Sequence, residues 1–217
     1  MAELPPKVQV EELANFVMFG DKPIDGATRV PRLAFAHRAG KPRITVFTNS
    51  PNDTVSFGMI SAPMDPNTFF TLLELISTIA DGPNDNKYKV ENYTGVYNEG
   101  VSTGEKQLLS ETFVGKDADG VMWICVASGA RPKIKFEFTI SDYHKIFKAT
   151  GEPLTKAEAS VRSAKGTVKA LQKIFAIIVS GYRPTTAERT SGVTRKPVAP
   201  PAATVQVFDD TSDIPFN

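Results

Sequence analysis

The same order of apolar segments and turns occurs twice along this chain, and this repetition limits the folds it can adopt. Short segments with period-two alternation, separated by turns rich in Gly, Pro, Asn and Asp, predict β-strands. In the first half the predicted strands are 14–19, 31–37, 43–48 and 54–60. In the second half they are 87–93, 106–114, 121–127 and 133–140. The chain therefore predicts an α+β fold of two tandem four-strand-plus-helix units with antiparallel sheets.

A helix is predicted to complete the first unit. Asp65 has the position of an N-cap, and Pro66 lies in the first turn, where its missing N–H costs nothing. Gly82 ends the apolar periodicity. An oligonucleotide-binding β-barrel stays open as an alternative fold, because it too is built from short strands joined by Gly/Pro turns. Its single helix would be 66–80.

Two helices are predicted after the last strand. Ser141 is expected to cap a short helix that ends at Lys148 and completes the second unit. A separate long helix is expected to begin at Thr155, because Thr155 and Glu158 have the spacing of a capping box, and to end at Gly181.

Length and composition favour one domain followed by a tail. A chain of 217 residues with 41% hydrophobic residues can bury one sizeable core, which we assign to residues 1–182. Residues 183–217 are rich in Pro, Thr, Ala and Ser and are predicted to be a disordered linker with an acidic end.

The single cysteine and the lack of long apolar stretches indicate a cytoplasmic protein that does not enter a membrane. Cys125 lies in an apolar run and is expected to be a small buried residue, which fits a reducing compartment. The N-terminal residues show no signal-peptide pattern, and the apolar run 174–179 is too short to span a bilayer.

Charge is distributed unevenly. The formal net charge is +1, and three of the negative charges are Asp209, Asp210 and Asp213, so the rest of the chain has a net charge of +4. A run of fifteen residues contains five basic side chains and no acidic one: Arg29, Arg32, Arg38, Lys41 and Arg43. A basic patch on strands suits a polyanion, although a solvated surface is the simpler alternative.

Strand alternation favours nucleic acid as that polyanion. In the strand 43–48, Ile44 and Val46 point to one face, which puts Phe47 beside Arg43 on the other. Aromatic rings stack on the exposed bases of a single strand while basic residues contact its phosphates, without any need for a particular sequence. The predicted phosphate contacts are Arg32, Arg38, Lys41, Arg43, Lys87, Lys89, Arg131, Lys133 and Lys135, and the predicted stacking residues are Phe47, Tyr88 and Trp123. For Trp123, burial in the core is an equally open interpretation.

Enzymatic functions are not supported. The two histidines, His37 and His144, have no Cys, Asp or Glu at metal-ligand spacing, so we expect no metal site. The segment 95–106 contains glycines but lacks the Gly-Lys-Ser/Thr of a phosphate-binding loop. It is expected to be a mobile β-loop or an ordinary connection. No pair of carboxylates is placed for general acid–base catalysis, and no cofactor is expected.

The last ten residues, 208–217, place an acidic cluster directly before an apolar Ile-Pro-Phe segment. This end resembles the partner-docking tail of bacterial single-stranded DNA-binding proteins, with Thr211 and Ser212 inside the acidic run and Asn217 after the phenylalanine. The resemblance implies that the tail binds replication or repair proteins. The residues implied in that contact are Asp209, Asp210, Asp213, Ile214, Pro215 and Phe216.

The predicted body, 14–180, resembles the Whirly fold of single-stranded DNA-binding proteins, which also has two repeats of four strands and a helix. Together the two resemblances imply a phage-type single-stranded DNA-binding protein that protects DNA during replication, recombination or repair in the cytoplasm of a bacterial host. A protein-binding adaptor and an RNA-binding regulator are the alternatives. Sheet edges also favour pairing between chains, so a homo-oligomer is compatible with this fold.

Overall fold

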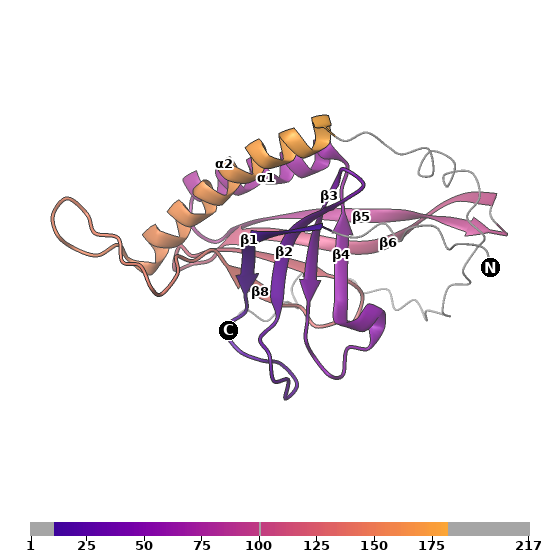
Figure 1. The fold of residues 1–217 in the computed structure, drawn as a ribbon, viewed down its shortest axis with the longest axis horizontal. Helices are drawn as coiled ribbons and strands as arrows, with labels where there is room; N and C mark the ends of the chain where they lie inside the picture. The colour runs from indigo at the N-terminus through magenta and orange to yellow at the C-terminus, as the bar shows by residue number, and fades with distance from the viewer. Residues whose placement is uncertain (1–10, 100, 182–217) are drawn as a thin grey trace.

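The computed structural model describes residues 11–99 and 101–181, which form two antiparallel sheets and two helices (Figure 1). Sheet A contains, in spatial order, β1 (Glu11–Phe19), β2 (Arg32–Arg38), β3 (Lys41–Phe47) and β4 (Met59–Pro63), and the helix α1 (Pro66–Asp81) follows. Sheet B contains β5 (Asn86–Asn98), β6 (Val101–Lys116), β7 (Met122–Ala127) and β8 (Lys135–Glu137), and α2 (Lys156–Gly181) comes after it. The predicted α+β class is confirmed. Neither sheet closes into a barrel within the described residues, so the barrel alternative is wrong.

Both helices begin as the sequence predicts. At α1, an Asp65 carboxylate oxygen accepts a hydrogen bond from the Thr68 N–H at 3.1 Å. At α2, the Thr155 N–H donates to the Glu158 carboxylate at 2.9 Å, and the Glu158 N–H donates to the Thr155 hydroxyl at 3.2 Å. This reciprocal pair is a capping box, which satisfies N–H groups that the first turn of a helix leaves free.

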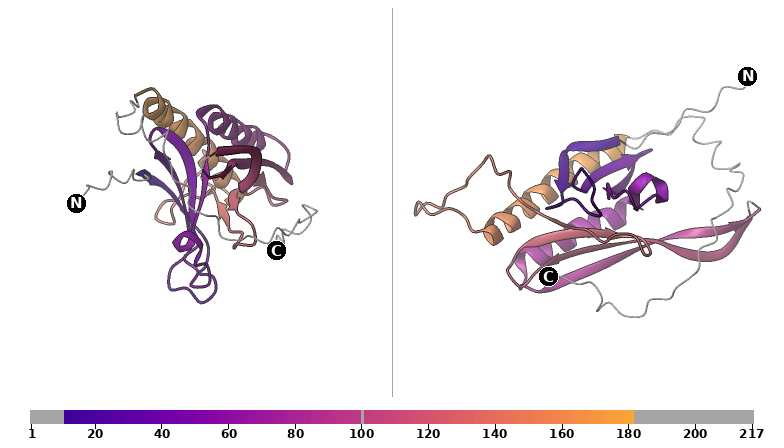
Figure 2. Two further views of the ribbon diagram at one scale, coloured as in Figure 1. Left: turned by 90° about the vertical axis from the view of Figure 1, so that its right-hand side faces the viewer. Right: turned by 90° about the horizontal axis from the view of Figure 1, so that it is seen from below.

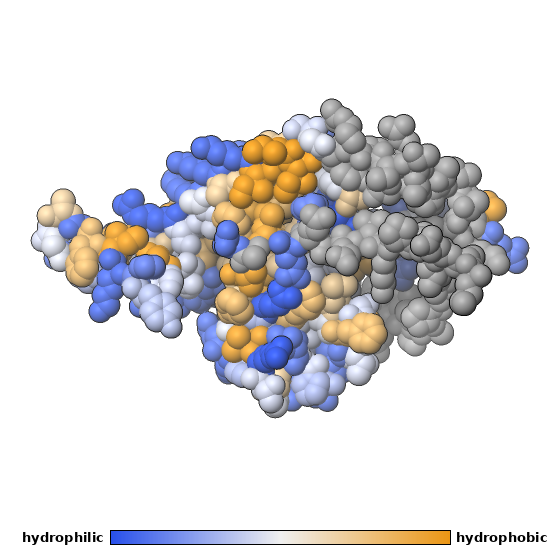
Figure 3. All heavy atoms as spheres, in the orientation of Figure 1, coloured by the Kyte–Doolittle hydropathy of each residue, from blue (hydrophilic) through white to orange (hydrophobic). Residues whose placement is uncertain are grey.

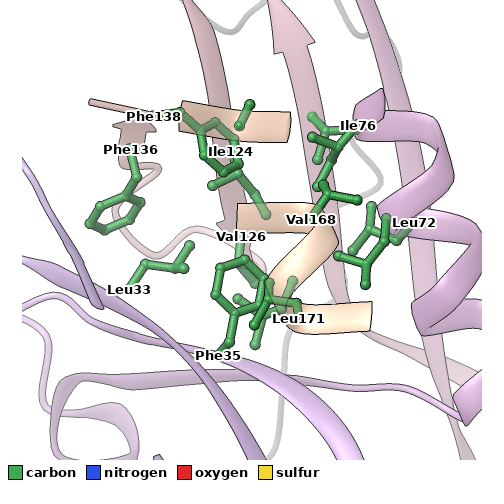
Figure 4. Close-up of a cluster of buried hydrophobic side chains, with 14 of the residues drawn as sticks. Leu33, Phe35, Leu72, Ile76, Ile124, Val126, Phe136, Phe138, Val168 and Leu171 are labelled. Carbon is green, nitrogen blue, oxygen red and sulfur yellow. The ribbon is translucent and has the colours of Figure 1, made fainter. Parts of the chain in front are cut away.

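One hydrophobic core joins both units. The two helices lie side by side over the sheets (Figure 2), and buried side chains from both sheets and both helices form one cluster (Figure 4). Phe69 of α1 and Phe175 of α2 are fully buried, with ring centroids 4.4 Å apart. Phe35 of β2 packs edge-on against Phe69 at 6.4 Å. The sheets therefore present only their outer faces and edges for binding.

The predicted short helix at 141–148 is wrong. This segment is part of a projecting loop in which the Leu154 N–H donates to the Ile146 carbonyl at 2.9 Å. The large side chains of this segment, among them Tyr143 and Phe147, are exposed. An isolated helix of eight residues is unstable without burial of an apolar face, which explains the difference. The helix of the second unit is α2.

Four predicted strands differ clearly from the structure in their limits: 54–60, 87–93, 106–114 and 133–140, the last of which is a strand only at Lys135–Glu137. The segment predicted as a strand at 54–60 begins instead with a turn, Val55–Gly58, in which Ser56 and Phe57 have positive φ, and β4 starts only at Met59. In sheet B, β5 and β6 continue far beyond β7 as a two-stranded hairpin (Figure 1). We call residues 93–99 and 101–109 the β5–β6 arm. The segment 95–106 belongs to it and is therefore mostly strand.

Candidate nucleic-acid interface

The register of sheet A gathers four of the predicted basic residues on the face directed away from the core. Arg32 pairs with Phe47, Ala36 with Arg43 and Arg38 with Lys41. Paired residues of antiparallel strands point to the same side, so these side chains share one face, which we call the outer face of sheet A. Ile44 and Val46 point into the core, as the alternation of β3 predicts.

Three cations at one end of this face have no carboxylate partner among the described residues. Arg38, Lys41 and Arg43 make no ion pair there, and Arg43 donates only to the Ser61 hydroxyl at 3.3 Å. The Nε of Arg43 is buried without a hydrogen-bond partner. Burial, and then the neighbouring charge of Arg38, lower the pKa of Arg43. A bound anion would favour the charged form of Arg43 and so oppose both effects.

The other end of the outer face has aromatic rings and an arginine whose charge is neutralised by a glutamate. The Arg32 guanidinium donates to both carboxylate oxygens of Glu12 and lies 4.0 Å from the centroid of the Phe47 ring. Phe47 is half-buried, so the exposed stacking position predicted for it is only partly available. Phe19 pairs with Arg32 across the sheet and is 62% exposed. Phe19 is absent from the predicted stacking residues, although its alternation with Met18 in β1 indicates that it lies on the face opposite the core.

The side chains at the centre of the outer face of sheet A are not accessible to solvent. Ala34 and Ala36 of β2 and Thr45 of β3 are fully buried. Accessible side chains therefore lie at the two ends of the face, with the cations Arg38 and Lys41 at one end and Phe19 at the other.

The outer face of sheet B holds a second, smaller cluster of buried side chains. Trp123 is 3% exposed and clusters with Phe113, Cys125 and Ala127. Its ring lies against Gly115 of β6, where an added Cβ would come within 2.5 Å of the ring. Of the two interpretations open for Trp123, the structure has the buried one. Burial also raises the pKa of Cys125 to about 11, as expected for an unreactive thiol.

Two lysines on the outer face of sheet B, Lys89 and Lys135, are paired with acids. Lys89 contacts Glu91 at 2.6 Å and Glu111 at 3.3 Å, and these hydrogen bonds raise the pKa of Lys89. Lys135 contacts Asp117 at 2.9 Å. The shift at Lys89 is opposite to that at Arg43, whose pKa is lowered first by burial and then by the charge of Arg38. Lys89 and Lys135 therefore have carboxylate partners, whereas Arg38, Lys41 and Arg43 have none among the described residues.

Three more predicted residues of sheet B are separated from one another. Lys87 is exposed on the outer face, where it pairs across β6 with Gly115. Tyr88 pairs with Val114 and so points to the opposite, helix-covered side, where it is 38% exposed. It therefore does not form a stacking platform with Lys87. Lys133 is exposed just before β8.

Arg131 does not belong to a binding surface, contrary to the prediction. Its guanidinium donates to Asp53 at 2.8 and 3.0 Å and to the carbonyls of Met59 and Val55 at 2.9 and 3.1 Å. The side chains of Arg131 and Asp53 are 13% and 3% exposed. Arg131 thus fastens the loop after β7 to the turn before β4, and its donors are not available to phosphate.

A groove of about 930 Å³ opens beside Trp123, between sheet B and the start of α2. Its walls mix four lysines with four carboxylates: Lys87, Lys116, Lys135, Lys156, Asp85, Asp117, Asp119 and Glu137. Lys116 is engaged in the fold, since its Nζ donates to the carbonyls of Ala80 and Gly82 at 3.2 and 2.6 Å. This balance of charge does not select for an anion.

The described part of the chain contains no group of three or more His, Cys, Asp or Glu side chains that could hold a metal ion. No helix in residues 11–99 and 101–181 is both long and apolar enough to cross a membrane.

The predicted linker, 183–217, lies outside the described residues, as do the predicted partner-binding residues in it: Asp209, Asp210, Asp213, Ile214, Pro215 and Phe216. Comparisons with protein-family models, with curated proteins and with solved structures give no match.

Proposed function

We propose that this chain binds single-stranded DNA through the outer face of sheet A, without catalysis, and recruits replication or repair proteins through its acidic C-terminal tail. The observation that supports DNA binding most directly is the group Arg38, Lys41 and Arg43. These three cations lie together without a carboxylate partner among the side chains that the structure describes, and the pKa of Arg43 is lowered by burial and by Arg38. Phosphate groups would supply the missing negative charge.

Single strands fit this face better than duplex DNA. Its aromatic residues, Phe19 and the half-buried Phe47, lie in one row with Arg32, and rings at a strand surface can stack on bases only where the bases are unpaired. The repeated order of four strands and a helix also supports the resemblance to the Whirly fold. The tail similar to that of bacterial single-stranded DNA-binding proteins favours a phage-type protein acting in a bacterial host.

The test is binding of a fluorescent poly-dT oligonucleotide, next to duplex DNA and single-stranded RNA, over a range of salt concentrations. Each phosphate contact to a single strand contributes a slope of about −0.7 to log K against log salt, so three contacts give about −2. The variant Arg38→Glu/Lys41→Glu is expected to weaken binding by about tenfold or more and to reduce the magnitude of the slope by about 1.4.

A control with the same change of charge is Lys169→Glu/Lys173→Glu, two exposed positions on α2, which should leave binding close to that of the unmodified protein. Equal losses in both variants would mean that only net charge matters and that sheet A is not the site. Preference for RNA would assign the chain to RNA. Absence of binding at low salt would favour a protein-binding adaptor.

A further inference from the structure

Two protrusions stand at opposite ends of the molecule along its longest axis (Figures 1 and 2). One is the β5–β6 arm, which continues past the last β6–β7 pair, Glu111 with Ala127. The other is the segment 141–155 between β8 and α2, which we call the β8–α2 loop. The proposed DNA-binding function uses neither of them.

The arm has the properties of a protein-binding surface. Its exposed large side chains are Tyr93 (54%), Tyr97 (61%), Val101 (70%), Leu108 (45%) and Leu109 (39%). A two-stranded ribbon is only marginally stable in water unless it packs on something else. Among the described residues, both edges of the arm are also unpaired. The arm has only three charged side chains, Glu99, Glu105 and Lys106, and two of them are acidic, so it is not suited to bind a polyanion.

The β8–α2 loop is held by hydrogen bonds and exposes apolar side chains among polar ones (Figure 3). The Lys148 N–H donates to the Glu152 carbonyl at 2.7 Å, and the Lys148 ammonium contacts Glu158 of α2 at 2.9 Å. These bonds hold the loop in place, yet Tyr143 is 96% exposed and Phe147 58%. Lys145 is exposed between them. Large exposed aromatic residues on a fixed loop are typical of a contact surface.

We propose that the β8–α2 loop of one copy of this chain docks on the β5–β6 arm of the next copy. Apolar side chains are exposed on both surfaces, and both surfaces carry charges of either sign. Lys145 of the loop is opposite in charge to Glu99 and Glu105 of the arm, and Asp142 and Glu152 of the loop are opposite in charge to Lys106 of the arm. Because the loop and the arm lie at opposite ends of the molecule, the loop of one copy cannot contact the arm of the same copy. A contact between two unlike surfaces gives a closed ring where the rotation between copies closes and an open row where it does not. Surfaces at opposite ends of the long axis favour the open row.

Only a few exposed apolar side chains are available on each protrusion, so we assign the contact to the weak, transient class in the free protein. Copies held side by side on one DNA strand would make it at high effective concentration. The consequence is cooperative coating of long single strands, and this consequence alone rests on the proposed function.

The test is sedimentation velocity without DNA, up to the solubility limit. The sedimentation coefficient of the unmodified protein is expected to rise with concentration beyond the value for a dimer. A loop variant, Tyr143→Ser/Phe147→Ser, and an arm variant, Tyr97→Ser/Leu108→Ser, should each be monomeric. Mixed together, they should form a heterodimer and nothing larger, because each variant keeps one intact end. The control Phe57→Ser removes an exposed ring that lies at neither end and should behave as the unmodified protein.

A monomer at every concentration would overturn the proposal. So would a dimer that survives the loop variant, because it would mean that two arms pair with each other. With DNA, an oligonucleotide long enough for one copy reports on the proposed function, and a longer one reports on cooperativity. If the protein binds the short strand but shows no cooperativity on the long strand, the role of the end-to-end contact in coating DNA is overturned and the proposed DNA binding is not. Failure to bind the short strand would overturn only the DNA function.

Discussion

Arg131 and Asp53 show how a charged side chain predicted for binding becomes part of the fold. Burial by itself would raise the pKa of Asp53, but hydrogen bonds from Arg131 and Thr48 outweigh burial, and the pKa is lowered. A basic residue near a turn gives no sign in the sequence of whether its partner is a phosphate or a carboxylate 78 positions away. The distinction needs the tertiary contact between the turn before β4 and the loop after β7.

We expect Arg131→Ala to destabilise the protein by about 3 kcal/mol near neutral pH, because it leaves a buried carboxylate without its cation. The lowered pKa of Asp53 means that the ion pair stabilises the fold above the unfolded pKa of about 4 and that this contribution is lost as pH falls through the folded pKa. Urea unfolding at pH 7 and at pH 3 should therefore show a smaller difference between the two proteins in acid.

The double variant Arg131→Ala/Asp53→Asn supplies the control for this ion pair, since removing the orphaned charge should recover part of the lost stability. A loss of stability in Arg131→Ala that is equal at both pH values would contradict the electrostatic explanation. DNA affinity should stay unchanged in these variants once they are folded, because Arg131 has no free donors for phosphate.

At the scale of elements, the sequence predicted what depends on local chemistry. The Asp65 cap, the Thr155–Glu158 capping box and the alternation of β3 need only neighbours in sequence, and all are confirmed. The failures involve segments whose structure depends on burial elsewhere. The segment 141–148 has no core to pack against, so it is not helical. The arm extends beyond β7 because hairpin pairing between β5 and β6 continues without a third strand.

The same limit applies to the candidate site. Alternation placed Arg43 and Phe47 on one face correctly, because strand geometry fixes that relation. It could not predict that Arg32 would cover the Phe47 ring or that Glu12 would neutralise Arg32, because both contacts come from cross-strand neighbours. Nor could it distinguish the compensated Lys89 from the uncompensated Arg43.

Replacement of glycine by alanine should have opposite effects on stability at a position in β6 and at a position in α2. A Cβ at Gly115 of β6 would lie 2.5 Å from the Trp123 ring, so Gly115→Ala is expected to cost about 1–3 kcal/mol. A Cβ at Gly166 of α2 would meet no atom within 4 Å, so Gly166→Ala is expected to stabilise the protein by about 1 kcal/mol through helix propensity. Thermal unfolding followed by Trp123 fluorescence measures both.

The emission of Trp123 provides a further check on these glycine variants. It should shift to longer wavelength only in Gly115→Ala, where the ring must move from its site. Stabilisation by Gly115→Ala would mean that the ring does not lie over β6 as the structure has it.

For the whole molecule, the distribution of charge links the two proposed binding activities. The chain has a formal net charge of +1, and without Asp209, Asp210 and Asp213 it would be +4. Since Arg38, Lys41 and Arg43 lack carboxylates among the described residues, an acidic segment of the same chain can compete with DNA for them. This competition needs no fixed structure in the tail, only a linker that lets it reach sheet A.

Deletion of residues 208–217 should therefore tighten binding of poly-dT, most at low salt, and abolish binding of host replication or repair proteins. The variant Phe216→Ala separates the two effects, because it keeps every charge and removes the apolar group that a partner pocket would hold. It should leave DNA affinity unchanged while still losing the partner. Fluorescence anisotropy with the oligonucleotide, and calorimetric titration with a candidate partner, measure the two affinities in each protein. If deletion leaves both affinities unchanged, the tail has no part in either activity, and sheet A binds DNA without competition.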